Sequence, residues 1–143
     1  MKKVEMDYSK NHPNNFNKNI KRVLILSKDH FCINRLRSNY SDEKHESYIT
    51  EIYDFESAGT AIMFAEEYRF EVLIFDYSTC SDNTINYLEY LTLDNSISSE
   101  TMKVVMTDNF THIDESQRTK LLKYSNKVIS KTARYFSMDS ILR

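Results

Sequence analysis

Glycine and proline are almost missing from this sequence, with one of each among 143 residues. Most turns must therefore be made by Asn, Asp and Ser, whose side chains bond to the nearby backbone. Cysteine is scarce too, because Cys32 and Cys80 are the only two, and they lack the CxxC or Cys/His spacing of a metal site. The cysteines are expected to be bystander thiols rather than a redox pair.

Long apolar runs and an excess of basic charge are also lacking. The longest apolar runs, 23–26 and 72–75, are far shorter than the roughly 20 residues of a membrane-spanning helix, and no signal peptide is visible. A net charge of -2 excludes a generally basic, nucleic-acid-binding surface. We therefore expect a cytoplasmic protein that has neither a membrane span nor direct contact with nucleic acid.

The residues that are present suffice for one folded domain. The hydrophobic fraction of 41% and the aromatic fraction of 13% can fill a single core. Residues 1–20 are rich in Asn and Lys and contain the only proline, so they are predicted to form a flexible leader. The folded domain is predicted to span residues 21–143.

Strand-like and helix-like stretches alternate along that domain. The predicted strands are 22–26, 48–53, 72–76, 103–106 and 126–130. The predicted helices are 33–40, 57–68, 83–91, 114–124 and 136–143, the third of them capped by Asp82 or Asn83. Strands separated by helices form right-handed crossovers. The pattern therefore predicts an α/β fold with a five-stranded parallel sheet, doubly wound in the flavodoxin-like (βα)5 manner.

Polar residues follow most of the predicted strands. They are Ser27, Lys28 and Asp29, then Asp76, Thr107 and Lys131. The carboxyl ends of parallel strands meet at one edge of a sheet, where ligands of such folds bind. We therefore expect these side chains to converge.

Three of these residues have a characteristic order and spacing. Asp76 follows the third strand, Thr107 comes 31 positions later, and Lys131 comes another 24 positions on. In this spacing residues 21–143 resemble a receiver domain of bacterial response regulators. The resemblance implies that Asp76 accepts a phosphoryl group, that the Thr107 hydroxyl bonds to a phosphoryl oxygen and that Lys131 pairs with it. A carboxylate nucleophile needs such preplaced donors and cations. Simpler roles stay open: Asp76 as a helix cap, Thr107 in a turn and Lys131 as an ion-pair partner of Asp76.

The metal site implied by the resemblance would use Asp29, Asp76 and Ser78. The family has two acidic residues after the first strand, where this chain has Ser27 and Lys28. A hard divalent cation needs several anionic oxygens, so we expect at most weak Mg²⁺ binding. Lys28 either pairs with Asp76 in place of the metal or extends into solvent.

Further departures concern the phosphoryl pocket and its output. The segment 77–82 lacks the family's Pro and Gly, and Asp108 adds negative charge where a small residue is usual. Thr132 replaces a proline, and Val128 occupies the position of the family's switch aromatic. These departures favour a degenerate receiver.

Three functions follow from these residues. The favoured one is a pseudoreceiver, a two-component signalling module that acts by protein–protein interaction with little or no phosphorylation. The alternative is a working phosphoreceiver that takes a phosphoryl group on Asp76 from a histidine kinase. A binder of a phosphorylated cofactor is disfavoured, because the loop after the first strand lacks a glycine-rich cradle.

The partners and activity follow from the favoured function. The expected partner is a histidine kinase or another signalling protein, and a homodimer through helices 114–124 and 136–143 is possible. No enzymatic activity is expected beyond hydrolysis of an aspartyl phosphate. Two possibilities stay open for output: a stand-alone module that docks to partners, or an output domain outside this chain.

Overall fold

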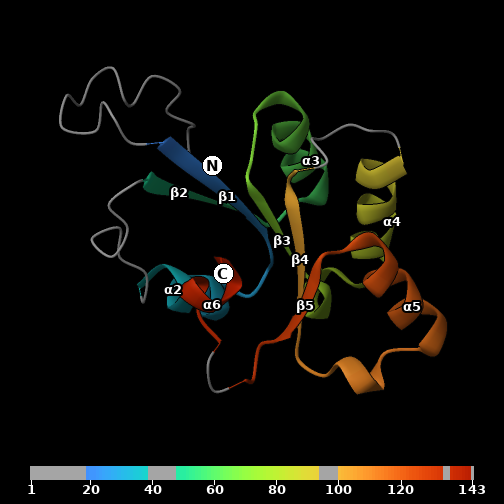
Figure 1. Cartoon of the computed structure of the whole chain (residues 1–143). Coiled ribbons are helices and arrows are strands. Elements are labelled where there is room, and N and C mark those ends of the chain that lie inside the picture. The colour runs from blue at the N-terminus through green and yellow to red at the C-terminus, as the bar shows by residue number, and fades with distance from the viewer. Residues whose placement is uncertain (1–18, 39–47, 94–99, 134–135, 143) are drawn as a thin grey trace.

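The computed structural model describes residues 19–38, 48–93, 100–133 and 136–142 (Figure 1). Its centre is a five-stranded sheet in the order β2-β1-β3-β4-β5, and each neighbouring pair is parallel. This is the flavodoxin-like order, in which the direction of winding reverses between β1 and β3. The predicted fold class and topology are confirmed.

The five strands and the helices between them follow the predicted alternation. The strands are β1 (Asn19–Leu26), β2 (Tyr48–Phe55), β3 (Val72–Asp76), β4 (Met102–Thr107) and β5 (Lys127–Ser130). The helices are α2 (His30–Ser38), α3 (Ala58–Glu67), α4 (Tyr77–Leu93), the 3-10 helix η3 (Phe110–His112), α5 (Glu115–Tyr124) and α6 (Met138–Leu142). None of the helices in the described ranges has the length and apolarity to cross a membrane.

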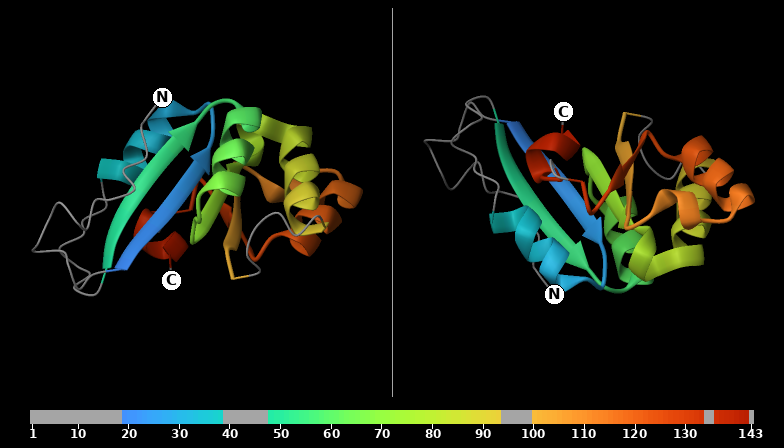
Figure 2. Two further views of the ribbon diagram at one scale, coloured as in Figure 1. Left: turned by 90° about the horizontal axis from the view of Figure 1, so that it is seen from above. Right: turned by 90° about the horizontal axis from the view of Figure 1, so that it is seen from below.

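Helices cover both faces of the sheet, α2 and α6 on one side and α3, α4 and α5 on the other (Figures 1 and 2). Successive side chains of a strand point to opposite faces, so a strand between two helical layers must be apolar at every position. In β1, Leu24 and Leu26 pack in the core under α3 and α4, whereas Val23 and Ile25 pack against α2 and α6. The continuous apolar run of β1 follows from this two-sided burial.

Helix α4 begins at Tyr77, directly after β3, and not near Asp82 or Asn83 as predicted. The Ser78 N–H donates to Asp76 Oδ1 at 3.1 Å, so Asp76 itself occupies the N-cap position. Without a Gly or Pro in the segment 77–82, nothing in the sequence interrupts the helix there. Asp76 therefore does have the capping role that the sequence left open.

Smaller differences lie at the ends of other elements. Strand β1 begins at Asn19, inside the predicted leader. Residues 1–18 of that leader lie outside the described residues, as do the last two positions of the predicted helix 33–40. The Asp114 side chain caps α5 by accepting the Ser116 N–H, and Leu122 of that helix is 58% exposed. Leu122 faces away from the sheet because Leu121, its neighbour 100° around the helix, takes the inner position.

Candidate functional site

Four polar side chains converge at the carboxyl edge of the sheet. Ser27 follows β1, Asp76 ends β3, Thr107 ends β4 and Lys131 follows β5. All four are buried, with exposures of 0% for Ser27 and Asp76, 3% for Thr107 and 9% for Lys131. The sequence prediction that these residues meet at one edge is confirmed.

Asp76 is held on both of its carboxylate oxygens. The Ser27 hydroxyl donates to Oδ2 at 2.6 Å, and the Lys131 ammonium donates to the same oxygen at 2.9 Å. The other oxygen, Oδ1, accepts the Ser78 N–H. The carboxylate is thus desolvated but fully supplied with donors, as a buried charge requires.

Lys131 also bonds to Asp29, so one ammonium bridges two carboxylates. Its Nζ lies 2.8 Å from Asp29 Oδ2. The second oxygen of Asp29 accepts the Cys32 N–H at 3.0 Å at the first turn of α2. The ring is closed by Ser27, whose Oγ accepts the Asp29 N–H at 3.0 Å. Asp29, Ser27, Asp76 and Lys131 therefore form one continuous network, which we call the Asp76 network.

The Asp76 network shifts the pKa values of two of its members. The hydrogen bond from Lys131, with help from the Cys32 N–H, holds the pKa of Asp29 below its ordinary value of 3.8. Burial acts to lower the pKa of Lys131, but the hydrogen bonds to Asp29 and Asp76 outweigh it, so this pKa lies above its ordinary value of 10.5. Both shifts mean that the charged forms stabilise the fold.

These shifts predict how stability depends on pH. A carboxyl with a lowered pKa stabilises the fold above its ordinary pKa, and this contribution disappears as pH falls through the folded value. We expect the Tm to be steady at neutral pH and to fall below pH 3.8. In Asp29→Asn part of this acid dependence should vanish, as thermal unfolding followed by circular dichroism would show. An unchanged acid profile in Asp29→Asn would contradict the role of Asp29.

The three residues predicted to bind metal lie together, but their side chains do not fit a divalent cation. Asp76 and Asp29 direct carboxylate oxygens to Lys131, and the Ser78 hydroxyl accepts the Asp108 N–H at 2.8 Å. Within the described ranges no three His, Cys, Asp or Glu side chains gather into a metal-binding group. An ammonium therefore occupies the position between the acidic side chains, and weak Mg²⁺ binding by Asp29, Asp76 and Ser78 stays a prediction.

Two hydrogen bonds join the segments around Asp76. Ser78 of α4 bonds to Asp108 after β4, and the Thr79 hydroxyl accepts the Lys28 N–H at 3.1 Å. The Asp108 carboxylate is largely exposed, with Oδ1 4.0 Å from Lys131 Nζ. The backbone N–H of Asp108 is thus used within the protein, while its side chain adds negative charge at the rim.

Lys28 extends into solvent, which settles the alternative left open by the sequence. Its side chain is exposed, and among the described residues the ion pair with Asp76 is made by Lys131. The sequence places Ser27 at this edge but does not predict its hydrogen bond to Asp76. The sequence feature that indicates this hydrogen bond is a hydroxyl directly after an apolar strand, at the edge where Asp76 is expected.

The two cysteines are free and buried. Burial raises the pKa of Cys32 to about 11 and also raises that of Cys80. Thiols with raised pKa values carry little thiolate at neutral pH and react slowly. The raised pKa values therefore argue against redox chemistry at either thiol.

Solved structures provide the comparison for this arrangement. A CheY-like receiver domain protein from Methanospirillum hungatei is 18% identical, covers 87% of this chain and 89% of its own, and gives a TM-score of 0.59. The chemotaxis response regulator CheY4 of Vibrio cholerae gives 0.59 at 12% identity, covering 87% of this chain and 94% of its own. The chain has the fold of a response-regulator receiver domain.

A third receiver neighbour was solved in a modified state. It is a response regulator of Burkholderia pseudomallei with a phosphorylated aspartic acid, a calcium ion and citrate, 15% identical with a TM-score of 0.59. The match covers 85% of this chain and 64% of that protein. No protein-family model and no curated protein sequence matches the chain. The likeness to receivers is therefore one of fold.

Proposed function

We propose that this chain is a two-component signalling module that works as a pseudoreceiver, binding protein partners with Asp76 held in its ion pair and not phosphorylated. The observation that carries the proposal is the occupation of both Asp76 oxygens by Ser27, Lys131 and the Ser78 N–H. A nucleophile must present a free lone pair to the incoming phosphorus. Here three donors from different parts of the fold already bond to the two oxygens.

Electrostatics supports the same conclusion. A phosphoryl group brings negative charge, which must be neutralised by preplaced cations in the transition state. Lys131 already binds two carboxylates, and Asp108 adds a third at 4.0 Å. The site therefore has one ammonium for three acids and a poor fit for Mg²⁺, and it offers little attraction to a phosphodonor.

The second candidate is a working phosphoreceiver, favoured by the retained Asp76, Thr107 and Lys131. Asp76 and Lys131 touch, and Thr107 is buried at the same edge of the sheet. The structural neighbour with a phosphorylated aspartic acid shows that this fold supports the chemistry in another protein. In this function, a histidine kinase would supply the phosphoryl group to Asp76.

A labelling experiment separates the two functions. The chain is incubated with acetyl phosphate and 10 mM Mg²⁺ beside an ordinary receiver, and acyl phosphate is measured by intact mass at a short reaction time. The pseudoreceiver predicts no added phosphoryl mass where the ordinary receiver is largely modified. Incorporation that is absent in Asp76→Ala would establish the phosphoreceiver instead.

Partner binding is tested separately from phosphorylation. A pseudoreceiver must bind its partner equally well with Asp76 intact and with Asp76→Asn, because no phosphoryl group is involved. Binding to candidate histidine kinases is measured by calorimetry with and without phosphodonor. A requirement for phosphodonor would contradict the proposal.

A further inference from the structure

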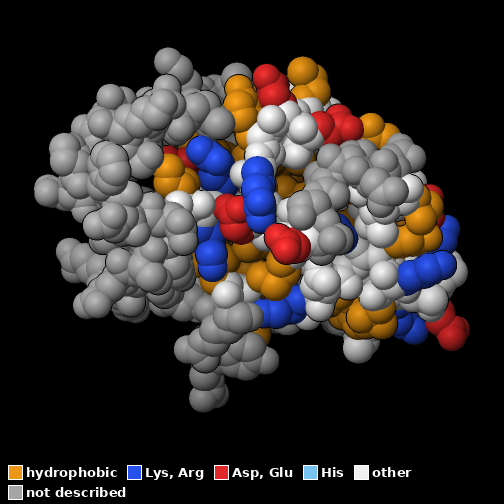
Figure 3. Space-filling view, turned by 45° about the horizontal axis from the view of Figure 1, so that its top comes forward, with side chains coloured by type: hydrophobic (Ala, Val, Ile, Leu, Met, Phe, Trp, Pro, Cys, Tyr) orange, Lys and Arg blue, Asp and Glu red, His pale blue; other side chains and the backbone are white. Residues whose placement is uncertain are grey.

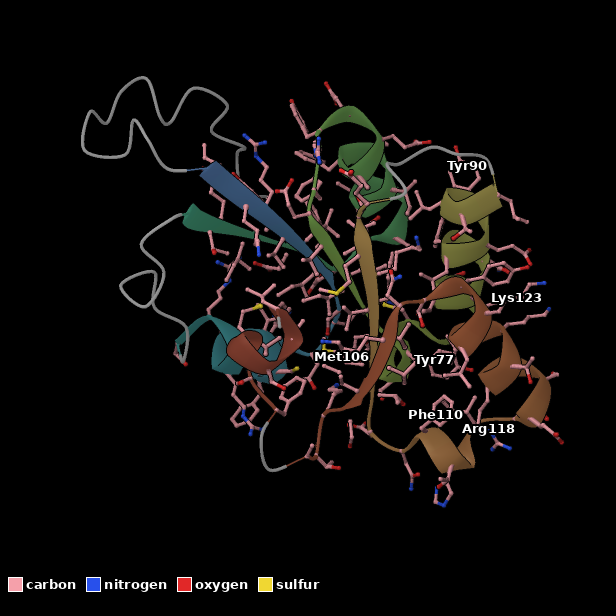
Figure 4. All side chains as sticks on the ribbon, viewed as in Figure 1. Tyr77, Tyr90, Met106, Phe110, Arg118 and Lys123 are labelled. Atoms are coloured by element: carbon pink, nitrogen blue, oxygen red, sulfur yellow. The ribbon has the colours of Figure 1, made fainter. Side chains whose placement is uncertain are left out.

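The helical layer formed by α3, α4 and α5 carries an uneven distribution of charge. Helix α4 lies between the other two and is bonded to each: the Tyr90 hydroxyl donates to Glu66 of α3 at 2.6 Å, and the Tyr77 hydroxyl donates to Gln117 of α5. The two tyrosines lie towards opposite ends of α4 (Figure 4). The three helices therefore present one connected outer face.

The α3 and α4 side of this face is acidic and partly apolar. Neither helix contains a Lys or Arg at any position, whereas their acids include Glu66, Glu67 and Glu89. A groove of about 370 Å³ lies between them. It is lined by Gly59, Ile62, Asn83, Asn86, Tyr87 and Tyr90. Acidic and apolar side chains lie side by side along the upper edge in Figure 3.

Apolar side chains remain exposed next to the groove. Met63 of α3 is 64% exposed and Tyr90 of α4 is 41% exposed. Met63 follows the groove residue Ile62 and precedes Glu66 by one helical turn, so it belongs to the same stripe of α3. Exposed apolar side chains beside a groove are typical of a surface that binds protein.

The C-terminal half of α5 has the opposite character, whereas its start carries the acids Asp114 and Glu115. Lys120 and Lys123 are exposed on α5, and Leu122 between them is 58% exposed. The Arg118 guanidinium is used within the chain, where it bonds to the carbonyl oxygens of Thr111 and Ile113. Lys123 is labelled on the outer side of α5 in Figure 4. The basic end thus combines lysines with an exposed leucine.

We infer that this face binds a second copy of the chain in a two-fold symmetric dimer. A face that is acidic at one end and basic at the other is complementary to itself after a rotation by 180°, which places α5 of each copy on the groove of the other. Leu122 would enter the apolar groove while Lys120 and Lys123 meet Glu66 and Glu67. A symmetric dimer forms this contact twice and is closed.

This inference is independent of the chemistry at Asp76, because none of its residues belongs to the Asp76 network. It shares α5 with the dimer expected through residues 114–124 and 136–143, but pairs that helix with α3 and α4 of the second copy instead of with α6. The contact is electrostatic at its rim, so it should weaken as salt shortens the Debye length from about 10 Å at 0.1 M to about 3 Å at 1 M.

A charge-swap experiment tests the dimer by sedimentation equilibrium over 5–500 µM protein. The wild type should shift from one chain to two as concentration rises. Lys120→Glu/Lys123→Glu, which makes α5 acidic, and Glu66→Lys/Glu67→Lys, which makes α3 basic, should each remain monomeric because like charges meet at both contacts. An equimolar mixture of the two variants should form a 1:1 dimer, since both contacts again pair opposite charges.

Two controls keep the result specific. Lys28→Glu reverses the charge of an exposed lysine outside this face and should dimerise like the wild type, and circular dichroism confirms that each variant is folded. Rescue in the mixture supports the inference. A wild type that stays monomeric at 500 µM in low salt, a dimer that neither charge reversal weakens, or a mixture without rescue would each overturn it.

Discussion

Lys131→Met should lower the free energy of unfolding by about 3–5 kcal/mol, because removing one partner of a buried ion pair leaves an uncompensated charge. The charge left behind is that of Asp76, whose side chain is 0% exposed. Asp29 loses the same partner but is one-third exposed, so water can take over there. Unfolding by urea at pH 7 would measure the loss.

Lys28→Met is the matched control for Lys131→Met. Lys28 is exposed at the same edge of the sheet, so this variant should stay within about 0.5 kcal/mol of the wild type. Asp76→Asn combined with Lys131→Met should regain most of the loss, since the buried charge is removed together with its partner. If Lys131→Met costs no more than Lys28→Met, the Asp76 network does not stabilise the fold as described.

Ser27→Asp should bind a divalent cation more tightly than the wild type does. Its carboxylate would lie beside Asp76, because Ser27 Oγ is 2.6 Å from Asp76 Oδ2. Without metal, two adjacent buried carboxylates repel each other and the Tm should fall. With Mg²⁺, the added anionic oxygen supplies the kind of ligand that the cation prefers, and the Tm should recover.

The size of the metal effect follows from linkage. Metal at 100 times its Kd stabilises a folded protein by about 2.7 kcal/mol. For a chain of this length that corresponds to a rise in Tm of roughly 5–10 °C. The measurement is thermal unfolding of each variant with and without 10 mM Mg²⁺, and Ser27→Asn serves as the uncharged control. Equal responses of the wild type, Ser27→Asn and Ser27→Asp to Mg²⁺ would refute the prediction.

The predictions for Lys131→Met and Ser27→Asp concern the same position at the carboxyl edge, which either the Lys131 ammonium or a divalent cation can occupy. Lys131, just after β5, binds Asp29 in the loop after β1 and Asp76 at the end of β3, so the site supplies its own positive charge. Restoring an acid at position 27 should shift the balance towards an external cation. A site that keeps its own ammonium between Asp29 and Asp76 gives a constant structure without ligand, which suits a module that acts by docking.

Much of the fold was determined by the sequence alone. Apolar runs such as 72–75 can be buried on both faces only within a parallel sheet covered by helices, and that requirement placed five strands and one converging edge. The positions of Asp76, Thr107 and Lys131 followed, because each comes at or just beyond the end of a strand. Periodicity and burial depend on local residue types, which the sequence displays directly.

The tertiary structure decided which donor meets which acceptor. Ser27 and Asp76 are 49 positions apart, and Lys131 lies 102 positions from Asp29, so no local pattern connects them. The start of α4 at Tyr77 was decided in the same way, since the capping side chain of Asp76 is also the acid that Lys131 and Ser27 hold. Side-chain pairing across a sheet edge depends on the register of distant strands, and register is fixed only when the whole core has packed.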